Sequence, residues 1–240
     1  MIERNCICYN YYALNFLRNG EINMNRKYDA VLFDFDGTIA DTGVGIFNSI
    51  RFAIAALGFK PIAEKRLRTF IGPPIYDSFK RELGLSDEQC KAAVARYRAA
   101  YSKSGIFQFE VYNGMEALIR ELHESGIKVC IASTKPAKFI NRIVDFLKIR
   151  ELIDFVSAPV GDDAPADKSV LISNAVEALE VDKNRVVMVG DRHFDVNGAN
   201  LAGVASIGVT YGYGSEEELK DAGATHIAHN AEEIKEIIFS

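Results

Sequence analysis

Two aspartates separated by a single residue form the first group in the sequence that could do chemistry. Asp34 and Asp36 directly follow the apolar run 30–33, and Gly37 and Thr38 come next. If the run is a strand of a parallel sheet, these residues lie at its carboxyl end, where such sheets place their sites. Two close carboxylates repel each other, and oxygen ligands suit Mg²⁺, so a divalent cation is a natural partner. Alone, the segment is equally compatible with an acidic turn closed by Gly-Thr.

A second acidic pair follows another apolar run, 186–189. Asp191 and Asp195 stand four residues apart in the stretch GDRHFD. A loop or a first helical turn could direct both side chains inward, although Asp195 alone is equally consistent with a helix cap. Together with the first pair, these residues predict four carboxylates at one sheet edge, a group whose charge a metal ion or protons must offset.

Two further segments offer groups that bind anions. Ser133 and Thr134 follow the apolar run 129–132, and hydroxyl and backbone N–H groups at the start of a helix form an anion site. Lys168 lies near the start of a later helical stretch. Taken one at a time, an ordinary helix start and a solvated lysine explain these residues better.

The elements that must position these residues alternate between short apolar runs and longer helical patterns. Continuous apolar runs are typical of strands buried on both faces of a parallel sheet, and this alternation predicts a doubly wound α/β fold. Capping boxes are indicated where a polar residue precedes Gln or Glu by three positions. The expected strands are 30–33, 129–132 and 186–189, with weaker candidates at 155–158, 204–209 and 225–228. The expected capping boxes are Ser86 with Gln89, Asn113 with Glu116, and Ser215 with Glu218.

One segment interrupts this alternation. Residues 42–112 contain helical patterns and no convincing buried strand, which predicts a helical insert after the first strand. We therefore expect a core made of residues 28–41 and 113–240, with 42–112 as a separate helical unit. Residues 1–27 read as a leader of uncertain role. Met24 begins a stretch typical of a natural start, so we expect 1–23 to be an accessory or mispredicted segment.

Composition excludes several classes of function. Lys and Arg number 28 against 33 Asp and Glu, a net charge of −5, so no basic excess exists to bind a nucleic-acid backbone. No apolar run approaches the 18 or more residues of a membrane span. The four cysteines show no zinc-site spacing, and free thiols fit a cytoplasmic protein. The oligomeric state is left open.

The ordered motifs resemble those of one superfamily. DFDGT at 34–38, Ser133-Thr134 after a strand, Lys168, and GDRHFD at 190–195 are similar to the four motifs of the haloacid dehalogenase-like hydrolases. Four motifs in order are far more specific than any one of them. Residues 42–112 stand where that superfamily has a helical cap on its Rossmann-like core. The chain is most similar to the phosphoglycolate phosphatase-like branch, and its segment SIGVTYGYGSEEEL resembles members described as 5′-nucleotidases.

The resemblance implies a role for each motif residue in cleaving a small phosphate monoester with Mg²⁺. Asp34 would attack phosphorus and form an aspartyl-phosphate, and Asp36 would act as acid and base. The remaining roles follow the motif order. Gly37 and Thr38 would shape the phosphate loop, Ser133, Thr134 and Lys168 would hold phosphoryl oxygens, Asp34, the Asp36 carbonyl and Asp191 would ligate Mg²⁺, and Asp195 would support them. Many relatives carry Asn where this chain has Thr134, so the chain departs from the family pattern at this position.

Several alternatives stay open at this stage. A sugar phosphomutase and a pyrophosphatase would use similar motifs, and so would a phosphonate hydrolase that uses a cap lysine, for which Lys60, Lys65 and Lys80 are candidates. A receiver-type signalling module would use a similar acidic pocket. In the cap, Arg66 and Arg68 could pair with a second anionic group of a substrate, but solvated charges are the better interpretation. His193, between the two carboxylates of its motif, is best read as a tolerated loop residue. The expected partner is a small phosphorylated metabolite, with no nucleic acid and no membrane.

Overall fold

A six-stranded parallel sheet forms the centre of the protein. The structure is a computed structural model that describes residues 26–161 and 167–240. All neighbouring strands of this sheet run parallel. In order across the sheet, the strands are β5 (Phe155–Ser157), β4 (Lys128–Ala132), β1 (Ala30–Phe33), β6 (Val186–Gly190), β7 (Ala205–Val209) and β8 (His226–Ala228). The six expected strands are all present, within one or two residues of their predicted ends.

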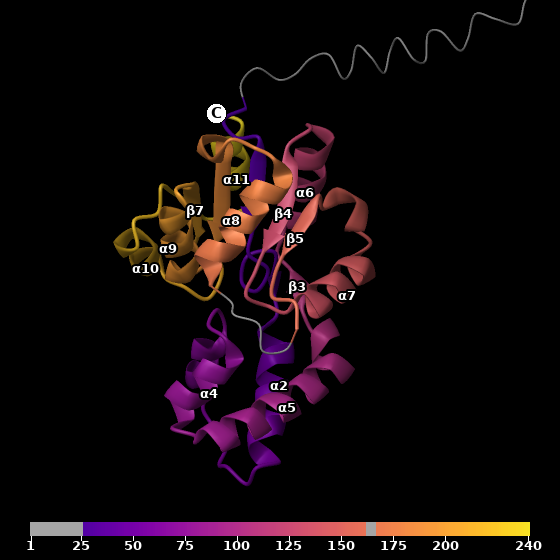
Figure 1. Cartoon of the computed structure of the whole chain (residues 1–240), viewed down its shortest axis with the longest axis vertical. Helices are drawn as coiled ribbons and strands as arrows, with labels where there is room; N and C mark the ends of the chain where they lie inside the picture. Colours follow the sequence, from indigo (N-terminus) through magenta and orange to yellow (C-terminus); the bar gives the residue numbers. More distant parts are fainter. Residues whose placement is uncertain (1–25, 162–166) are drawn as a thin grey trace, which may run out of the picture.

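Helices cover both faces of the sheet, so the doubly wound α/β fold is confirmed (Figure 1). Val31 and Phe33 of β1 point to one apolar cluster, and Ala30 and Leu32 point to the other. This alternation of side chains explains why the run is apolar without a break. The first face carries α6 (Met115–Glu124), α7 (Ala137–Leu147) and α11 (Ala231–Ile238), and the second carries α8 (Lys168–Leu179) and α9 (His193–Ala202).

The register of the central strands aligns their carboxyl ends. Phe33, the last residue of β1, pairs with Ile131 of β4 and with Val189 of β6. The residues that follow β1, β4 and β6 therefore emerge at one edge of the sheet. This edge is where the sequence motifs must meet.

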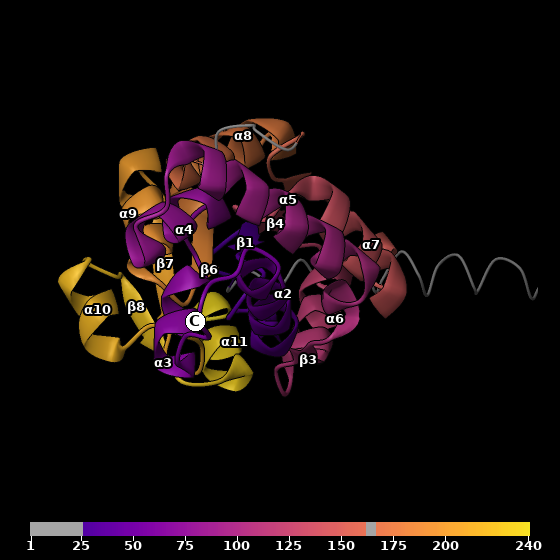
Figure 2. The same ribbon diagram turned by 90° about the horizontal axis from the view of Figure 1, so that it is seen from below.

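A helical unit lies between β1 and β4 in the chain and next to the core in space (Figure 1). A short antiparallel ribbon, β2 with β3, connects it to the core. Seen from below, α2, α4 and α5 lie in front of the sheet (Figure 2). The bounds of these elements are β2 (Ala40–Asp41), α2 (Gly43–Ala55), α3 (Glu64–Leu67), α4 (Ile75–Leu83), α5 (Asp87–Lys103) and β3 (Glu110–Val111). We call residues 42–112 the cap; the leader, apart from residues 26 and 27, falls outside the described residues.

The predicted helix starts are correct in part. Ser86 and Gln89 form the full capping box at α5. Ser215 accepts a hydrogen bond from the Glu218 N–H at α10 (Glu216–Asp221), but the Glu218 carboxylate bonds Arg192 and His193 instead. The prediction for Asn113 is wrong, because Gly114, with a left-handed φ of 82°, takes the N-cap position of α6.

Among the described residues, no helix combines the length and the apolar character needed to cross a membrane.

Candidate active site

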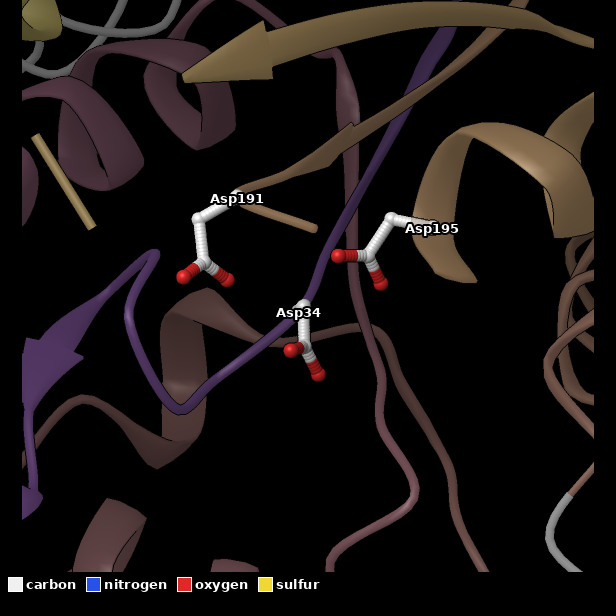
Figure 3. A group of neighbouring side chains, drawn as sticks. All are labelled: Asp34, Asp191 and Asp195. Atoms are coloured by element: carbon white, nitrogen blue, oxygen red, sulfur yellow. The ribbon is translucent and has the colours of Figure 1, made fainter. Parts of the chain in front are cut away.

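Three aspartates from two separate motifs meet at the carboxyl edge of the sheet. Asp34 follows β1, Asp191 follows β6, and Asp195 lies in the first turn of α9. The three side chains lie next to one another (Figure 3). One carboxylate oxygen from each lies within 4.8 Å of the others, and all three residues are buried. The sequence predicted a cluster of four carboxylates. The structure brings three of them together, and Asp36 is not part of this group.

Lys168, at the start of α8, provides a positive charge inside this cluster. Its Nζ lies 2.9 Å from Oδ1 of Asp34 and 2.8 Å from Oδ1 of Asp195, and it donates a hydrogen bond to the Ala132 carbonyl at 3.0 Å. Burial would lower the pKa of Lys168, but the two carboxylates outweigh burial and raise it above its usual value. The ammonium group therefore stays charged and ties two of the motifs together.

One lysine does not neutralise three buried carboxylates. Burial, together with Asp195 and Asp34, raises the pKa of Asp191 well above its ordinary range. Burial also raises the pKa of Asp195 to about 6, although Lys168 opposes this shift. A divalent cation offsets this repulsion while the carboxylates stay ionised. A set of donors made only of oxygen atoms matches the preference of Mg²⁺. The residues present fit such an ion, with Asp34 and Asp191 offering side-chain oxygens.

Asp191 is held rigidly by the loops around it. Its Oδ2 accepts a hydrogen bond from the Tyr213 N–H at 2.7 Å, and the Thr38 hydroxyl donates to Oδ1 at 3.4 Å. Gly37 has a φ of 90°, and a Cβ at this position would lie 2.2 Å from Oδ2 of Asp191. A Cβ on Gly212 would lie 2.4 Å from the Asp191 Cβ. Glycine is thus required where two backbone segments press against this carboxylate.

These pKa shifts predict how stability depends on pH and on Mg²⁺. Because the pKa values of Asp195 and Asp191 are raised in the folded protein, both carboxyl groups keep their protons to a higher pH there than in the unfolded chain. Their contribution to stability is therefore present below the unfolded pKa, 3.8 for Asp195, and is lost as the pH rises through about 6. Because Mg²⁺ binds the ionised carboxylates, we expect the rise in Tm caused by Mg²⁺ over EDTA to grow between pH 5 and pH 8.

Thermal unfolding at these pH values, with Mg²⁺ and with EDTA, measures this effect. Asp191→Asn is the matched variant, since it keeps the shape of the side chain and removes the charge. We expect it to lose most of the Mg²⁺ shift. A Mg²⁺ shift that is equal at all pH values, or one retained in Asp191→Asn, would contradict the assignment of the cluster as a metal site.

Asp36 has a different set of contacts from the other three aspartates. Its Oδ1 accepts a hydrogen bond from the Thr42 hydroxyl at 2.6 Å, and Lys135 Nζ lies 2.8 Å from both Oδ1 and Oδ2. Thr42 directly precedes α2 of the cap, and Lys135 belongs to the loop between β4 and α7. The carboxylate is thus held between cap and core, and a metal contact through the Asp36 backbone carbonyl stays a prediction.

The two hydroxyl residues after β4 occupy different positions. Ser133 is buried, and its Oγ accepts a hydrogen bond from the Lys135 N–H at 3.3 Å. The hydroxyl of Thr134 donates to the Gly72 carbonyl of the cap at 3.0 Å. In this structure Thr134 therefore fastens the cap loop, and its contact with phosphate stays a prediction.

Sequence reasoning missed three residues that build the site. Lys135 holds Asp36, the Tyr213 N–H holds Asp191, and Arg192 donates to the Ile71 carbonyl of the cap at 2.8 Å. Lys135 and Arg192 each stand directly beside a motif residue, and this adjacency was the signal available for them. No sequence pattern indicated Tyr213, whose contact with Asp191 depends on the fold.

The other candidates in and near the cap have local partners. Arg66 pairs with Glu82 at the surface, and Arg68 lies over the ring of Tyr213. His193 Nδ1 lies 2.6 Å from Oε1 of Glu218. These contacts agree with the interpretation of Arg66 and Arg68 as surface charges. The prediction of a loop position for His193 is wrong, because His193 is the first residue of α9.

A cavity of about 880 Å³ opens between cap and core. The cap contributes residues 70–77 and one face of α5, and the core contributes residues such as Asp36, Thr134 and Lys135. This volume is in the range of pockets that hold small-molecule ligands. Lys60, Lys65 and Lys80 are not part of its lining, so the structure does not support a cap lysine among these three as a reactive group.

Comparison with known proteins finds a matching family and several similar proteins. A sequence model of a family described as haloacid dehalogenase-like hydrolase matches residues 31–209. The chain is 31% identical over 214 residues to a 5′-nucleotidase of Pseudomonas aeruginosa, a match that covers 89% of this chain and 97% of that protein. It is also 31% identical over 211 residues to the tyrosine-protein kinase PtkA of Mycobacterium tuberculosis, covering 87% and 72%.

Solved structures show the same relationship. A predicted phosphatase from Clostridium acetobutylicum aligns with a TM-score of 0.83 at 34% identity, covering 87% of this chain and 97% of that one. Phosphoglycolate phosphatases and a pyrophosphatase are among the further relatives. The matched family segment contains every predicted site residue, from Asp34 to Asp195.

Proposed function

This chain belongs to the haloacid dehalogenase-like hydrolases, and we propose that it is a Mg²⁺-dependent phosphatase that cleaves small phosphate monoesters through an aspartyl-phosphate on Asp34. The observation that carries the proposal is the position of Asp34. It lies at the carboxyl end of β1, bonded to the buried Lys168 and grouped with Asp191 and Asp195. Relatives named as phosphoglycolate phosphatases, a 5′-nucleotidase and a pyrophosphatase support the same class of reaction.

In this mechanism Asp34 attacks the phosphorus atom. Lys168 holds Oδ1 of Asp34 at 2.9 Å, so we assign Oδ2 as the attacking oxygen. The alkoxide leaves, and Asp34 carries the phosphoryl group until water cleaves it. Bound Mg²⁺ would offset the repulsion between the carboxylate and the substrate dianion. Asp195 keeps Lys168 in place, and we assign to Ser133 and to the Lys168 ammonium the binding of phosphoryl oxygens.

Asp36 is the proposed acid and base. Protonated, it gives its proton to the leaving alkoxide; ionised, it takes a proton from the water that attacks the aspartyl-phosphate. Its position two residues after Asp34, facing the cavity between cap and core, supports this role. The substrate's leaving group would occupy that cavity.

The proposal also covers the division of the chain into domains, its location and its partner. We propose that residues 28–41 and 113–240 form the catalytic core and that the cap selects the substrate. We also propose a cytoplasmic location and a small phosphorylated metabolite as the partner.

Phosphate release from a panel of phosphorylated metabolites tests this function. The panel should include phosphoglycolate, nucleoside monophosphates, sugar phosphates and pyrophosphate, each assayed with Mg²⁺ and then with EDTA. We expect release from at least one monoester and a loss of at least about 100-fold on removal of the metal. Full activity in EDTA, or no release from any ester, would contradict the proposal.

Transfer to an acceptor other than water is the second candidate. The similarity to PtkA, named a tyrosine-protein kinase, favours this alternative. An aspartyl-phosphate on Asp34 could pass its phosphoryl group to a hydroxyl as well as to water, which also keeps a phosphomutase open. Mass balance separates them, since hydrolysis releases inorganic phosphate and transfer retains it on an acceptor.

A further inference from the structure

Lys135 is a buried cation at the junction of the cavity and the catalytic residues. Its side chain is 4% exposed, and its Nζ lies 4.8 Å from the centre of the Tyr101 ring. Both residues line the cavity between cap and core. Among the described residues, Asp36 is the carboxylate that its ammonium contacts.

A buried ammonium group needs an anion beside it, because an unpaired charge away from water is costly. In this structure the two oxygens of Asp36 fill that need. While Asp36 acts on the ester oxygen, however, it must turn at least one oxygen toward the substrate. Lys135 then loses part of its contact with the Asp36 carboxylate. The other residue that bonds this carboxylate, Thr42, has a neutral hydroxyl and supplies no negative charge for Lys135.

We propose that Lys135 binds an anionic group on the leaving group of the substrate, and that this enzyme prefers phosphate monoesters that carry one. The proposal rests on the proposed function and deepens it. In this structure the Asp36 carboxylate occupies the place that the substrate's anion takes during turnover. The shared chemistry is a carboxylate or a second phosphate.

Geometry limits where this anion lies in the substrate. Nζ of Lys135 is 2.8 Å from Asp36, and Asp36 must come within hydrogen-bond reach of the ester oxygen. The ammonium group therefore lies within about 6 Å of the ester oxygen. An anionic group centred two or three bonds from that oxygen reaches Lys135, and the rest of the cavity can hold a larger remainder.

A matched pair of substrates tests the preference. Phosphoglycolate carries a carboxylate two bonds from the ester oxygen, and phosphoglycolamide has the same shape without the charge. We expect kcat/KM for phosphoglycolate to exceed that for phosphoglycolamide by at least about tenfold. Phosphonomethyl phosphate carries a phosphonate two bonds from the ester oxygen in place of the carboxylate, so it stands for a second phosphate and shows which of the two anions is preferred.

Lys135→Met removes the charge and retains much of the side-chain length. We expect the ratio between the two substrates to fall to about one, with the loss on phosphoglycolate mainly in KM, whatever happens to the overall rate. Lys135→Arg should restore part of the ratio. Lys128→Met is the control, since Lys128 begins β4 at the opposite edge and pairs with Asp154. It should leave the ratio unchanged.

Binding measurements separate this proposal from the proposed function. In an Asp34→Asn background, which cannot turn over, Kd for the two compounds should show the same preference, and adding Lys135→Met should remove it. An equal fall for both substrates in Lys135→Met, or equal Kd values with Lys135 present, overturns the proposal. Absence of turnover together with a Lys135-dependent Kd preference would instead overturn the hydrolase mechanism alone.

Discussion

Replacement of Asp34 by asparagine is expected to abolish phosphate release, by roughly 10⁴-fold or more, while the protein stays folded. An amide oxygen cannot serve as the nucleophile, so the aspartyl-phosphate does not form. The fold should tolerate the change because Asp34→Asn removes one of three buried carboxylates that repel one another. Steady-state phosphate release and thermal unfolding in EDTA measure the two effects.

Asp145→Asn is a matched control for this substitution. Asp145 lies on α7 and pairs with Arg150 at the surface, far from the cluster in the sequence. We expect it to keep both activity and Tm. Turnover by Asp34→Asn within tenfold of the wild type would remove Asp34 from the nucleophile position, and loss of the fold would assign it a structural role instead.

Replacement of Lys168 by methionine is expected to affect both stability and activity. Without the ammonium group, Asp34 and Asp195 remain buried with no positive partner among the described residues. Removing one partner from a buried ion pair costs about 3–5 kcal/mol. The phosphoryl group also loses a positive contact, so we expect phosphate release to fall by about 100-fold or more.

The loss of stability in Lys168→Met should be smaller at pH 5 than at pH 8. Protonation relieves the repulsion between the unpaired carboxylates at low pH, and Mg²⁺ should restore part of the stability at high pH. Denaturant unfolding at both pH values measures the change. Lys220→Met, which removes a surface pair with Glu216, should cost less than about 1 kcal/mol. Equal stability of Lys168→Met and the wild type would mean that the cluster is not held by this charge.

Much of the fold could be predicted because its strands are buried on both faces. The runs 30–33, 129–132 and 186–189 are apolar throughout, and the structure places each in the centre of the sheet. The ribbon of β2 and β3 escaped prediction because each strand has only two residues, too few to show a period. The start of α6 was misplaced because the left-handed turn at Gly114 sets the helix boundary in place of a polar cap.

The site could be predicted where motif residues follow strands directly. Asp34 and Asp191 meet because β1 and β6 are neighbours in register. That both lie at one edge could be predicted, since the sites of parallel sheets lie at the carboxyl ends of the strands. The contacts of Lys135 with Asp36 and of Arg192 with Ile71 depend on how the cap lies against the core. Such contacts join residues about 100 positions apart and leave no local pattern in the sequence.

Trapping of the phosphorylated enzyme during turnover tests the central claim most directly. Borohydride reduces an aspartyl-phosphate to homoserine, which peptide mass spectrometry can locate in protein quenched during turnover of a substrate with Mg²⁺. The mechanism predicts homoserine at position 34, and none there when substrate is left out or when EDTA is present. Homoserine at another aspartate, or none at all in protein that is releasing phosphate, would contradict it.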